Sequence, residues 1–413
     1  GAVVVMGLSV RELSRWWMGE NGGGVDSVTH DSFSERHEMT RVVGVIGGGQ
    51  LARMMTPAAI NLGLEIYVLA QDSYESAKIA VTALGNHTDA AAVVSFARGC
   101  DVITFDHEHV PQDVLAELVA SGANVQPSPE ALVFAQDKLV MRERLAALGV
   151  PVPGWARVRS ESELADFLAE YGSRAVVKTA RGGYDGKGVR VVTSADQARD
   201  WLEALGENEA LLVEEFVAFR RELAQQIART PSGEMALWPV VETVQTDGVC
   251  TEVIAPAPDT AGAIADMTAS IAETIATGLN ITGALAVELF ETEDDRILVN
   301  ELAMRPHNSG HWSMDGALTS QFEQHLRAVL DLPLGATSTL APWSVMVNIL
   351  GGPASGDLDA CLTRAMKEYP EAKFHLYGKT PRPGRKIGHV NVIGQDLSAT
   401  VAAARGAAGF FRD

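Results

Sequence analysis

A lysine-bearing apolar run that leads directly into a glycine-rich loop constrains this chain more than any other stretch of its sequence. Residues 174 to 190 read Arg-Ala-Val-Val-Lys-Thr-Ala-Arg-Gly-Gly-Tyr-Asp-Gly-Lys-Gly-Val-Arg. The apolar run that ends at Lys178 predicts a strand, and the close-set glycines after it predict a loop. Such glycines let backbone N–H groups converge on an anion, and Lys178, Arg181 and Lys187 add positive charge. The stretch therefore predicts a binding site for a phosphate chain.

This loop differs from the Walker phosphate loop, which requires a glycine, four further residues and then Gly-Lys-Ser/Thr. Arg181 occupies the position of the first glycine, and Gly188 occupies that of the hydroxyl residue. A Walker site is therefore excluded. A solvated hairpin tip is the alternative for the loop taken alone, and the motifs elsewhere in the chain favour the phosphate site.

Length and charge limit the class of protein. A chain of 413 residues, 46% of them hydrophobic, is long enough for two or three domains with large cores. Its formal charge of −20 disfavours nucleic-acid and membrane-surface partners, which require a basic face. The three cysteines, at 100, 250 and 361, form no CxxC pair, so neither a disulfide framework nor a zinc site is indicated. A reducing cytoplasm is expected.

The first 38 residues are expected to lie outside the fold. Residues 1 to 10 are apolar, but no basic segment precedes them, and no run approaches the roughly 18 residues of a membrane span. Residues 19 to 38 combine glycines with scattered Ser, Asp and His. We therefore expect a disordered extension over 1–38, and neither secretion nor membrane insertion.

The next segment predicts a Rossmann-like domain. Val42 to Ile46 has the composition of a buried parallel strand, and Gly-Gly-Gly-Gln-Leu-Ala from Gly47 fits the G-x-G-x-x-A turn that opens a helix. A helix to about Leu62 and a strand from Leu64 to Ala70 follow, with Asp72 near the position of a ribose-binding acid. A nicotinamide oxidoreductase is one alternative, although such turns also occur in α/β folds that bind no dinucleotide.

Residues 102 to 111 predict a strand that runs directly into polar groups, Asp106 to His109. Ligands bind at the carboxyl ends of strands in open α/β sheets. Two carboxylates and two histidines in four positions are compatible with a metal site, a solvated loop or a substrate contact.

A helix and a strand flank the glycine loop in the sequence. Apolar residues recur at helical spacing over 129 to 149 and stop at Gly149, which predicts a single helix that carries Lys138. Ala210 to Val217 predicts a buried strand, although it contains two glutamates and Glu222 follows it. Buried acids need a partner. The strand backbone could pair with adenine while a carboxylate accepts ribose hydroxyls, and an edge strand with solvated acids is the alternative.

The sharpest pattern is a hairpin with two facing acids. Ala286 to Phe290 and Ile297 to Glu301 are largely apolar runs joined by the polar turn Glu-Thr-Glu-Asp-Asp-Arg. If the hairpin is symmetric about that turn, Glu288 and Glu301 face each other with Cβ atoms roughly 5 Å apart. Like charges repel, so the pair predicts a cation between them, and carboxylate oxygens suit Mg²⁺ or Mn²⁺.

Two donor-rich loops complete the candidate site. Met304 to Trp312 reads Met-Arg-Pro-His-Asn-Ser-Gly-His-Trp, which has too many donors for a core segment and predicts a ligand-facing loop. Residues 379 to 386 contain four cations held among prolines and a glycine. In an acidic chain such a loop favours a phosphomonoester, because Arg and Lys make charge-assisted bonds to phosphate. A solvated basic tip is the alternative.

Together these motifs resemble the ATP-grasp superfamily: a lysine strand, a Gly-Gly-Tyr-Asp-Gly-Lys-Gly loop, a Glu-Glu-Phe-Val strand, and a paired glutamate and Asn-Glu. The stretches GGGQLARM, GGYDGKG, NELAMRPHNSGHW and RPGRKIGH are similar to those of the ATP-dependent 5-(carboxyamino)imidazole ribonucleotide synthetases of purine biosynthesis, over about residues 40 to 400. The resemblance implies a mixed α/β and α+β architecture. Its expected parts are a Rossmann-like domain over 39–135, an ATP-grasp domain over 136–335 with a small lid at about 174–217, and a C-terminal domain over 336–413.

The resemblance also implies an activity, that of a carbon–nitrogen ligase. Enzymes of this family use ATP and Mg²⁺ to convert bicarbonate to carboxyphosphate, and then carboxylate 5-aminoimidazole ribonucleotide with release of ADP and phosphate. Bicarbonate is a poor electrophile, and phosphorylation supplies a leaving group without any covalent nucleophile on the protein. A cytoplasmic homodimer with small-molecule substrates, and with neither nucleic-acid nor membrane partners, is expected.

Site residues follow from the same resemblance, position by position. The expected ATP contacts are Lys138, Lys178, Gly183, Tyr184, Asp185, Gly186, Lys187, Gly188, Glu214, Glu215, Phe216, Val217, Glu222, Gln245, Asn300 and Glu301. The expected contacts to the ribonucleotide and bicarbonate are Gln50, Glu108, Tyr184, Asp185, Arg305, His307, Lys379 and Arg385. The expected catalytic groups are Glu108, Lys187 and Arg305, and the expected metal ligands are Glu288 and Glu301.

Two motifs depart from the family pattern, at three positions. Where the family usually reads Glu-Ile-Glu-His-Val, this chain has Asp-His-Glu-His-Val from Asp106, which leaves that first acid without an expected role. Lys187 replaces an arginine found in some relatives, so the charge is kept but the bidentate fork is lost. Another ATP-grasp ligase and a non-catalytic nucleotide-binding regulator remain alternatives beside the oxidoreductase, and RPHNSGHW and RPGRK argue against the other ligase.

Overall fold

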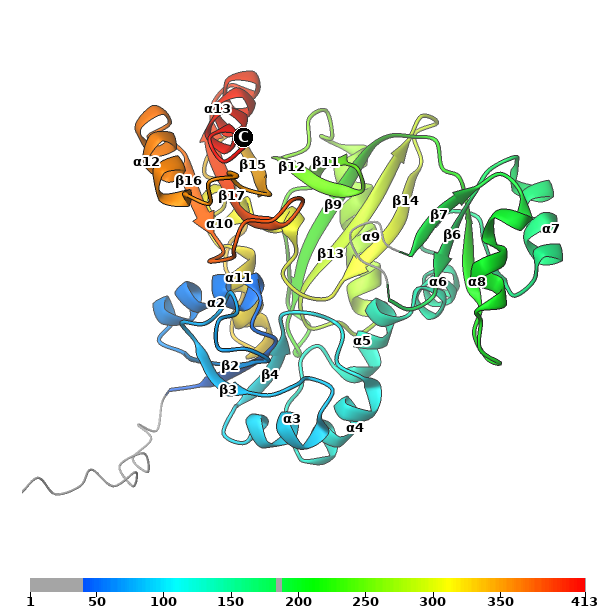
Figure 1. The fold of residues 1–413 in the computed structure, drawn as a ribbon, viewed down its shortest axis with the longest axis horizontal. Coiled ribbons are helices and arrows are strands. Elements are labelled where there is room, and N and C mark those ends of the chain that lie inside the picture. Colours follow the sequence, from blue (N-terminus) through cyan, green and yellow to red (C-terminus); the bar gives the residue numbers. More distant parts are fainter. Residues whose placement is uncertain (1–39, 183–187, 413) are drawn as a thin grey trace, which may run out of the picture. The chain divides into compact units, whose positions relative to one another are not determined.

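The structure, a computed structural model, describes residues 40–182 and 188–412 (Figure 1). The extension expected over 1–38, and Gly183 to Lys187 of the glycine loop, lie outside the described residues. From Arg41 onward the chain forms one compact unit. Among the described residues, every helix is too short or too polar to span a bilayer.

A parallel sheet of four strands begins the described chain. Its order is β3 (Val81–Leu84), β2 (Glu65–Ala70), β1 (Val42–Ile46) and β4 (Val102–Phe105). The accompanying helices are α2 (Gln50–Asn61), α3 (Ala90–Ala97) and α4 (Gln112–Ala120). The central strand β1 is apolar and buried along its whole length, as a parallel strand covered on both faces requires. The Rossmann-like start predicted from the sequence is confirmed.

The single helix predicted over 129–149 is wrong, because two helices cover this stretch. They are α5 (Pro129–Gln136) and α6 (Lys138–Ala147). Between them Asp137 has an extended backbone, and its side chain accepts hydrogen bonds from the N–H groups of Leu139 and Val140 at 3.0 and 3.1 Å. Asp137 therefore caps a new helix. The apolar spacing continues across the break, so periodicity alone could not reveal it.

A small antiparallel sheet follows, in the order β5 (Trp155–Val158), β8 (Leu211–Glu215), β6 (Ala175–Thr179) and β7 (Val189–Val192). Its helices are α7 (Glu161–Tyr171), η2 (Ala195–Ala198) and α8 (Arg199–Glu203). Side chains alternate across a strand. Val177 and Val213 pack in the core with α7, whereas Leu212 packs with Leu139 of α6 on the other side. Lys178 shares that second face.

The large sheet occupies the rest of the chain, in the order β14-β13-β9-β11-β12-β15-β17-β16, with β10 paired to β9. Its strands are β9 (Phe219–Arg229), β10 (Met235–Leu237), β11 (Val241–Thr246), β12 (Val249–Ala255), β13 (Gly283–Thr292), β14 (Ile297–Ala303), β15 (Trp343–Leu350), β16 (Lys373–Leu376) and β17 (Lys386–Gly394). The helices of this part are α9 (Ala263–Gly278), η3 (Asn308–Gly310), α10 (Ser313–Gly316), α11 (Gln321–Val329), α12 (Leu358–Glu368) and α13 (Leu397–Gly409).

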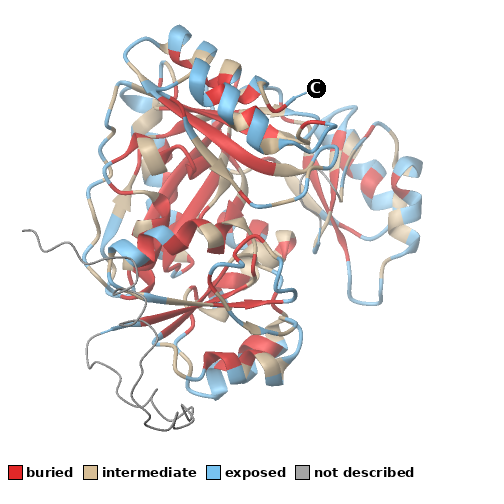
Figure 2. Cartoon of the chain, turned by 60° about the vertical axis from the view of Figure 1, so that its left-hand side comes forward, coloured by how far each residue is buried: buried red, intermediate tan, exposed pale blue. Residues whose placement is uncertain are grey.

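The C-terminal strands β15, β17 and β16 continue this sheet, and their two faces differ. One face is apolar and packs under α12 and α13. The other carries buried polar side chains that bind the segment after β14: Asn391 donates to the carbonyl of His311 at 3.0 Å, and Asn348 donates to Oδ1 of Asn308 at 3.1 Å. Figure 2 shows sheet strands buried along most of their length beneath helices with exposed outer faces. The C-terminal region thereby supports the donor-rich loop from behind.

Candidate active site

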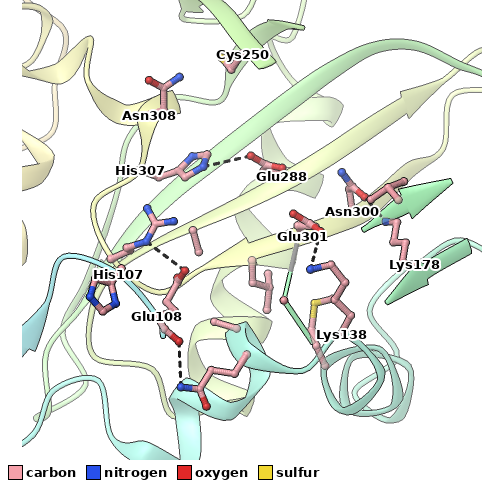
Figure 3. Close-up of a pocket in the computed structure, with 18 of the residues that line it drawn as sticks. His107, Glu108, Lys138, Lys178, Cys250, Glu288, Asn300, Glu301, His307 and Asn308 are labelled. Atoms are coloured by element: carbon pink, nitrogen blue, oxygen red, sulfur yellow. Dashed lines mark hydrogen bonds and ion pairs between the residues drawn. The ribbon is translucent and has the colours of Figure 1, made fainter. Parts of the chain in front are cut away.

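One cavity of about 1300 Å³ is lined by residues of the two antiparallel sheets and by residues of α2 and of the segment after β4 (Figure 3). Except for Gly188, every described residue predicted for the site lines this cavity. These lining residues are Gln50, Glu108, Lys138, Lys178, Glu214, Glu215, Phe216, Val217, Glu222, Gln245, Glu288, Asn300, Glu301, Arg305, His307, Lys379 and Arg385. The predicted contacts Gly183, Tyr184, Asp185, Gly186 and Lys187 lie outside the described residues.

Two lysines reach the cavity from different elements and meet the same strand. Lys178 of β6 donates a hydrogen bond from Nζ to Oδ1 of Asn300 at 3.0 Å. Nζ of Lys138, the first residue of α6, lies 3.3 Å from Oε1 of Glu301. Both lysines sit at the root of the glycine loop, because the N–H of Lys138 donates to the carbonyl of Ala180. Two ammonium groups at this root provide the charge that a phosphate chain requires.

Glu214 is the acid whose need for a partner the sequence predicted, and the structure confirms it. Its carboxylate lies 2.7 Å from Nζ of Lys178 and also pairs with the guanidinium of Arg142. All three side chains are almost fully buried. Burial works to raise the pKa of Glu214, but the charges of Lys178 and Arg142 outweigh it and hold that pKa below its ordinary value. Arg142 was not predicted as part of the site.

The cavity wall beyond β8 is suited to a base and a ribose. Phe216 and Val217 follow the last residue of that strand, and the guanidinium of Arg174 lies 3.8 Å from the centroid of the Phe216 ring. Gln245 of β11 and Glu222 of β9 line the same cavity. Burial raises the pKa of Glu222 to about 6. A carboxylate in this position can accept hydrogen bonds from hydroxyl groups.

Glu288 and Glu301 are direct partners in the β13–β14 ladder, as predicted. The prediction assumed a symmetric hairpin, and that assumption is wrong, because the register of the two strands shifts next to this pair. Nearer the turn Leu289 pairs with Val299, so Asn300 is an extra residue, a β-bulge, and the facing acids result from it.

The electrostatics of this pair match a bound divalent cation. Burial, followed by the charges of Glu301 and Glu222, raises the pKa of Glu288 to about 8. The exposed 28% of the Glu288 side chain faces the cavity, where Nε2 of His307 lies 3.4 Å from Oε1 (Figure 3). Burial lowers the pKa of His307 to about 3, so this histidine is neutral and brings no positive charge to Glu288. Crowded hard oxygen donors of this kind suit Mg²⁺ or Mn²⁺.

The donor-rich loop after β14 faces the cavity through Arg305, His307 and His311. Its ends, Met304 and Trp312, are fully buried, so the segment is part core and part ligand wall. Glu108, just beyond β4, accepts the N–H of Met304 at 2.7 Å, and its other oxygen lies 3.2 Å from Nε of Arg305. The two predicted catalytic groups Glu108 and Arg305 are thus in direct contact.

The cationic loop lines the cavity beside Gln50, a region that we call its cationic end. Lys379 donates to Oε1 of Gln50 at 2.5 Å, and Arg385 donates to the carbonyl of Thr380 at 3.1 Å. Burial, followed by the charge of Arg385, lowers the pKa of Lys379. Like charges that crowd each other in this way are stabilised by an anion.

The glycine-rich turn after β1 binds a carboxylate of the protein itself. Asp106 accepts the N–H of Ala52 at the start of α2 at 2.7 Å. A Cβ atom on Gly49 would lie 2.1 Å from Oδ2 of Asp106, so glycine at that position makes room for the aspartate. Because Asp106 fills the helix N-terminus where a pyrophosphate would bind, the dinucleotide alternative is wrong. Asp106, the acid for which the comparison with the family pattern gave no expected role, therefore has a structural role.

Two residues have roles that the sequence analysis did not predict, for different reasons. Arg142 stands four residues after Lys138, so it shares a helix face with a predicted ligand contact, and that spacing could have indicated it. The role of Asp106 could not be predicted in this way, because its partner is a backbone amide more than fifty residues earlier in the chain.

Three family models match successive parts of the chain. They describe a ribonucleotide synthetase preATP-grasp domain at residues 39–136, an ATP-grasp domain at 143–322, and a phosphoribosylaminoimidazole carboxylase C-terminal domain at 344–403.

Known relatives cover nearly the whole described chain. The N5-carboxyaminoimidazole ribonucleotide synthase of Mycobacterium tuberculosis is 52% identical over 362 residues, which cover 86% of this chain and 84% of that protein. The enzyme of the same description from Bacillus subtilis is 37% identical and covers 86% and 92%.

A solved structure is similar over the same region. The N5-carboxyaminoimidazole synthase of Aspergillus clavatus, in complex with ADP and 5-aminoimidazole ribonucleotide, has a TM-score of 0.80 and 34% identity, and covers 90% of this chain and 98% of that one. With matches of this extent in sequence, in all three domains and in three dimensions, the chain belongs to the N5-carboxyaminoimidazole ribonucleotide synthase family of ATP-grasp enzymes.

Proposed function

We propose that this protein is a ligase that carboxylates 5-aminoimidazole ribonucleotide with bicarbonate at the cost of one ATP. The observation that carries the proposal is the opposite charge at the two ends of one cavity. Crowded carboxylates lie at the β13–β14 end and crowded cations at the residue 379–386 end. Such a cavity can hold a metal-bound triphosphate and a phosphomonoester at the same time. The A. clavatus relative, solved with ADP and the ribonucleotide, supports this pair of ligands.

At the nucleotide end, Lys138 and Lys178 bind the phosphates of ATP, and the strand end from Glu214 to Val217 holds the adenine. Glu222 accepts the ribose hydroxyls, and Gln245 lines the same cavity. Glu288 and Glu301 would hold Mg²⁺, which when bound neutralises charge on the transferring phosphoryl group. The two lysines, already fixed by carboxylate and amide partners, require little reorganisation when the phosphates arrive.

At the substrate end, Lys379 and Arg385 bind the phosphate of the ribonucleotide. Arg305 and His307, between the two ends, bind bicarbonate, and Glu108 orients Arg305 through their contact. A bicarbonate oxygen attacks the γ-phosphorus and ADP leaves, which forms carboxyphosphate. The exocyclic amine then attacks the carboxyl carbon, the C–O bond to phosphate breaks, and the amine loses a proton, so the products are the carbamate and inorganic phosphate.

The proposal extends to the setting of the enzyme. A homodimer is expected from the resemblance to the family, and a reducing cytoplasm from three cysteines without a CxxC pair. A formal charge of −20 disfavours nucleic-acid and membrane-surface partners.

The deciding experiment combines the protein with ATP, Mg²⁺, ¹³C-bicarbonate and 5-aminoimidazole ribonucleotide. We expect the ribonucleotide to stimulate ADP release, and a ¹³C carbamate signal to appear in step with it. ADP release that the ribonucleotide leaves unchanged, with no labelled carbamate, would overturn the proposal.

A further inference from the structure

The extra residue in β14 gives the nucleotide end of the cavity its shape. In a regular strand, neighbouring side chains point to opposite faces. Here the ladder advances one residue on β13, from Glu288 to Leu289, while β14 advances two, from Glu301 to Val299. The bulge at Asn300 lets Asn300 and Glu301, although consecutive, both line the cavity. Figure 3 shows both side chains directed towards the lysines.

β14 is the edge strand of the large sheet, so its outward-facing backbone groups have no strand beside them, and the bulge takes further groups out of the ladder. These backbone groups need other partners. Arg142 supplies them. Its guanidinium donates to the carbonyl of Val299 at 2.8 Å and to that of Asn300 at 2.9 Å. The N–H of Val299 donates to the carbonyl of Pro151 at 2.9 Å. Since Arg142 is fully buried, water does not compete for these bonds.

The same guanidinium is held in turn by Glu214, which also holds Lys178. Lys178 completes the hydrogen-bond network, because it donates to the side chain of Asn300. One arginine therefore connects β14, the strand that carries Glu301, to the lysine at the root of the glycine loop. The planar fork of arginine spreads its N–H groups over two carbonyls and a carboxylate, whereas a lysine ammonium concentrates its donors at one point.

We infer that Arg142 is a positioning residue that holds the Asn300 bulge in register, and thereby sets Glu301 opposite Glu288 for binding the metal of a metal–nucleotide complex. Without the hydrogen bonds of this guanidinium, the backbone of β14 is no longer held in the bulged conformation at Asn300. A slip of one residue would turn Glu301 away from the cavity. Arg142 itself does not line the cavity.

The test measures nucleotide binding, and it needs no turnover. The dissociation constant of ADP is measured by calorimetry with Mg²⁺ and with EDTA. The value in EDTA divided by the value with Mg²⁺, here called the metal ratio, isolates the contribution of the metal to binding. In Arg142→Lys, which keeps a cation beside Glu214, we expect that ratio to fall roughly tenfold, as for other residues that orient metal ligands. Metal-free ADP should bind nearly as well as before, because Lys178 keeps its partner. Mn²⁺ binding in the presence of ADP, followed by electron paramagnetic resonance, should weaken by the same factor.

Arg221→Lys is the matched control. Arg221 is a partly buried arginine that pairs with Glu291 at the turn end of the same hairpin and does not line the cavity. The Arg221→Lys variant should melt at a lower temperature than the parent, and its metal ratio should be unchanged. If both variants lower the two ADP affinities equally, or neither changes the ratio, Arg142 has only a general structural role and the inference is overturned.

Should Arg142→Lys fail to fold, Arg142→Gln keeps a hydrogen-bond donor at this buried position without the charge, and Glu214 retains Lys178 as its partner. The same loss of the metal ratio is expected, and an unchanged ratio would equally refute the inference. The inference rests on the proposed nucleotide site, and the two fail differently. No ADP binding by the unaltered chain refutes the site, whereas normal ADP binding with an unaltered ratio in the variant refutes only the role of Arg142.

Discussion

The two ends of the cavity crowd charges of opposite sign. At the hairpin end, burial and the neighbouring acids raise the pKa of Glu288 to about 8. At the cationic end, burial and Arg385 lower the pKa of Lys379. Glu214 differs from both, because Lys178 and Arg142 match its charge and hold its pKa low. A buried charge that the protein already matches belongs to the scaffold, whereas a crowd of like charges indicates a ligand of the other sign.

The strongest test of the acidic end is Glu288→Gln or Glu301→Gln. Each change removes a charge that we propose binds Mg²⁺, so kcat should fall on the order of 100-fold at saturating ATP. The metal-free protein should melt no lower than the parent, since the change also relieves a repulsion. Near-normal turnover at limiting Mg²⁺ in either variant would show that the facing acids are not a metal site.

The cationic end is tested by Arg385→Ala. Loss of one charge-assisted bond to phosphate should cost roughly 1.5 to 3 kcal/mol, or about tenfold to hundredfold in kcat/KM for the ribonucleotide. The KM for ATP should barely change. Lys178→Ala is the counterpart and should weaken ATP instead. If Arg385→Ala weakens ATP and spares the ribonucleotide, the two ends have been assigned in reverse.

The pH dependence of metal binding sharpens the same comparison. A carboxyl group with a raised pKa is protonated until the pH approaches about 8, and Mg²⁺ must displace that proton. The Mg²⁺ concentration for half-maximal ADP binding should therefore fall by up to about tenfold per pH unit between pH 6 and pH 8, and then level off. A requirement that is flat over this range would contradict the raised pKa.

Stability without metal should change in the opposite direction. The folded protein binds the Glu288 proton more tightly than the unfolded chain does, so this group makes the free energy of unfolding fall as pH rises from its ordinary pKa towards about 8. Thermal melting in EDTA at pH 6 and pH 8 should show a smaller difference for Glu288→Gln than for the parent. An equal difference would mean that another group controls this window.

The smallest effect is expected from the amino terminus. A variant that starts at Met39 should keep the activity and solubility of the full chain, because the glycine-rich stretch before it has little apolar surface to bury. Initial rates and gel filtration of the two proteins provide the comparison. A large loss of either would place these residues among the functional parts of the molecule.

Local patterns predicted the elements whose partners are near in sequence. The buried strand at Val42 to Ile46, the end of the following helix before Gly63, and the acid pair across a short turn all depend on contacts within one unit of structure. The break at Asp137 was missed because apolar periodicity continues through it, and only the cap geometry reveals it. The glycine-rich turn after Ile46 left a dinucleotide site as one alternative, and in the structure Asp106, which follows β4, occupies that turn.

The sequence by itself determined the chemistry of the site, since the lysines, the paired acids and the cationic loop are all recognisable as residue types at particular spacings. The tertiary structure decided which charges are matched and which are left for a ligand. It set Arg142 against the bulge at Asn300, and it set Glu108 against Arg305 across nearly two hundred residues. A sequence shows which side chains carry charge, but burial and distance determine the energy of that charge, and both arise only when remote segments pack together.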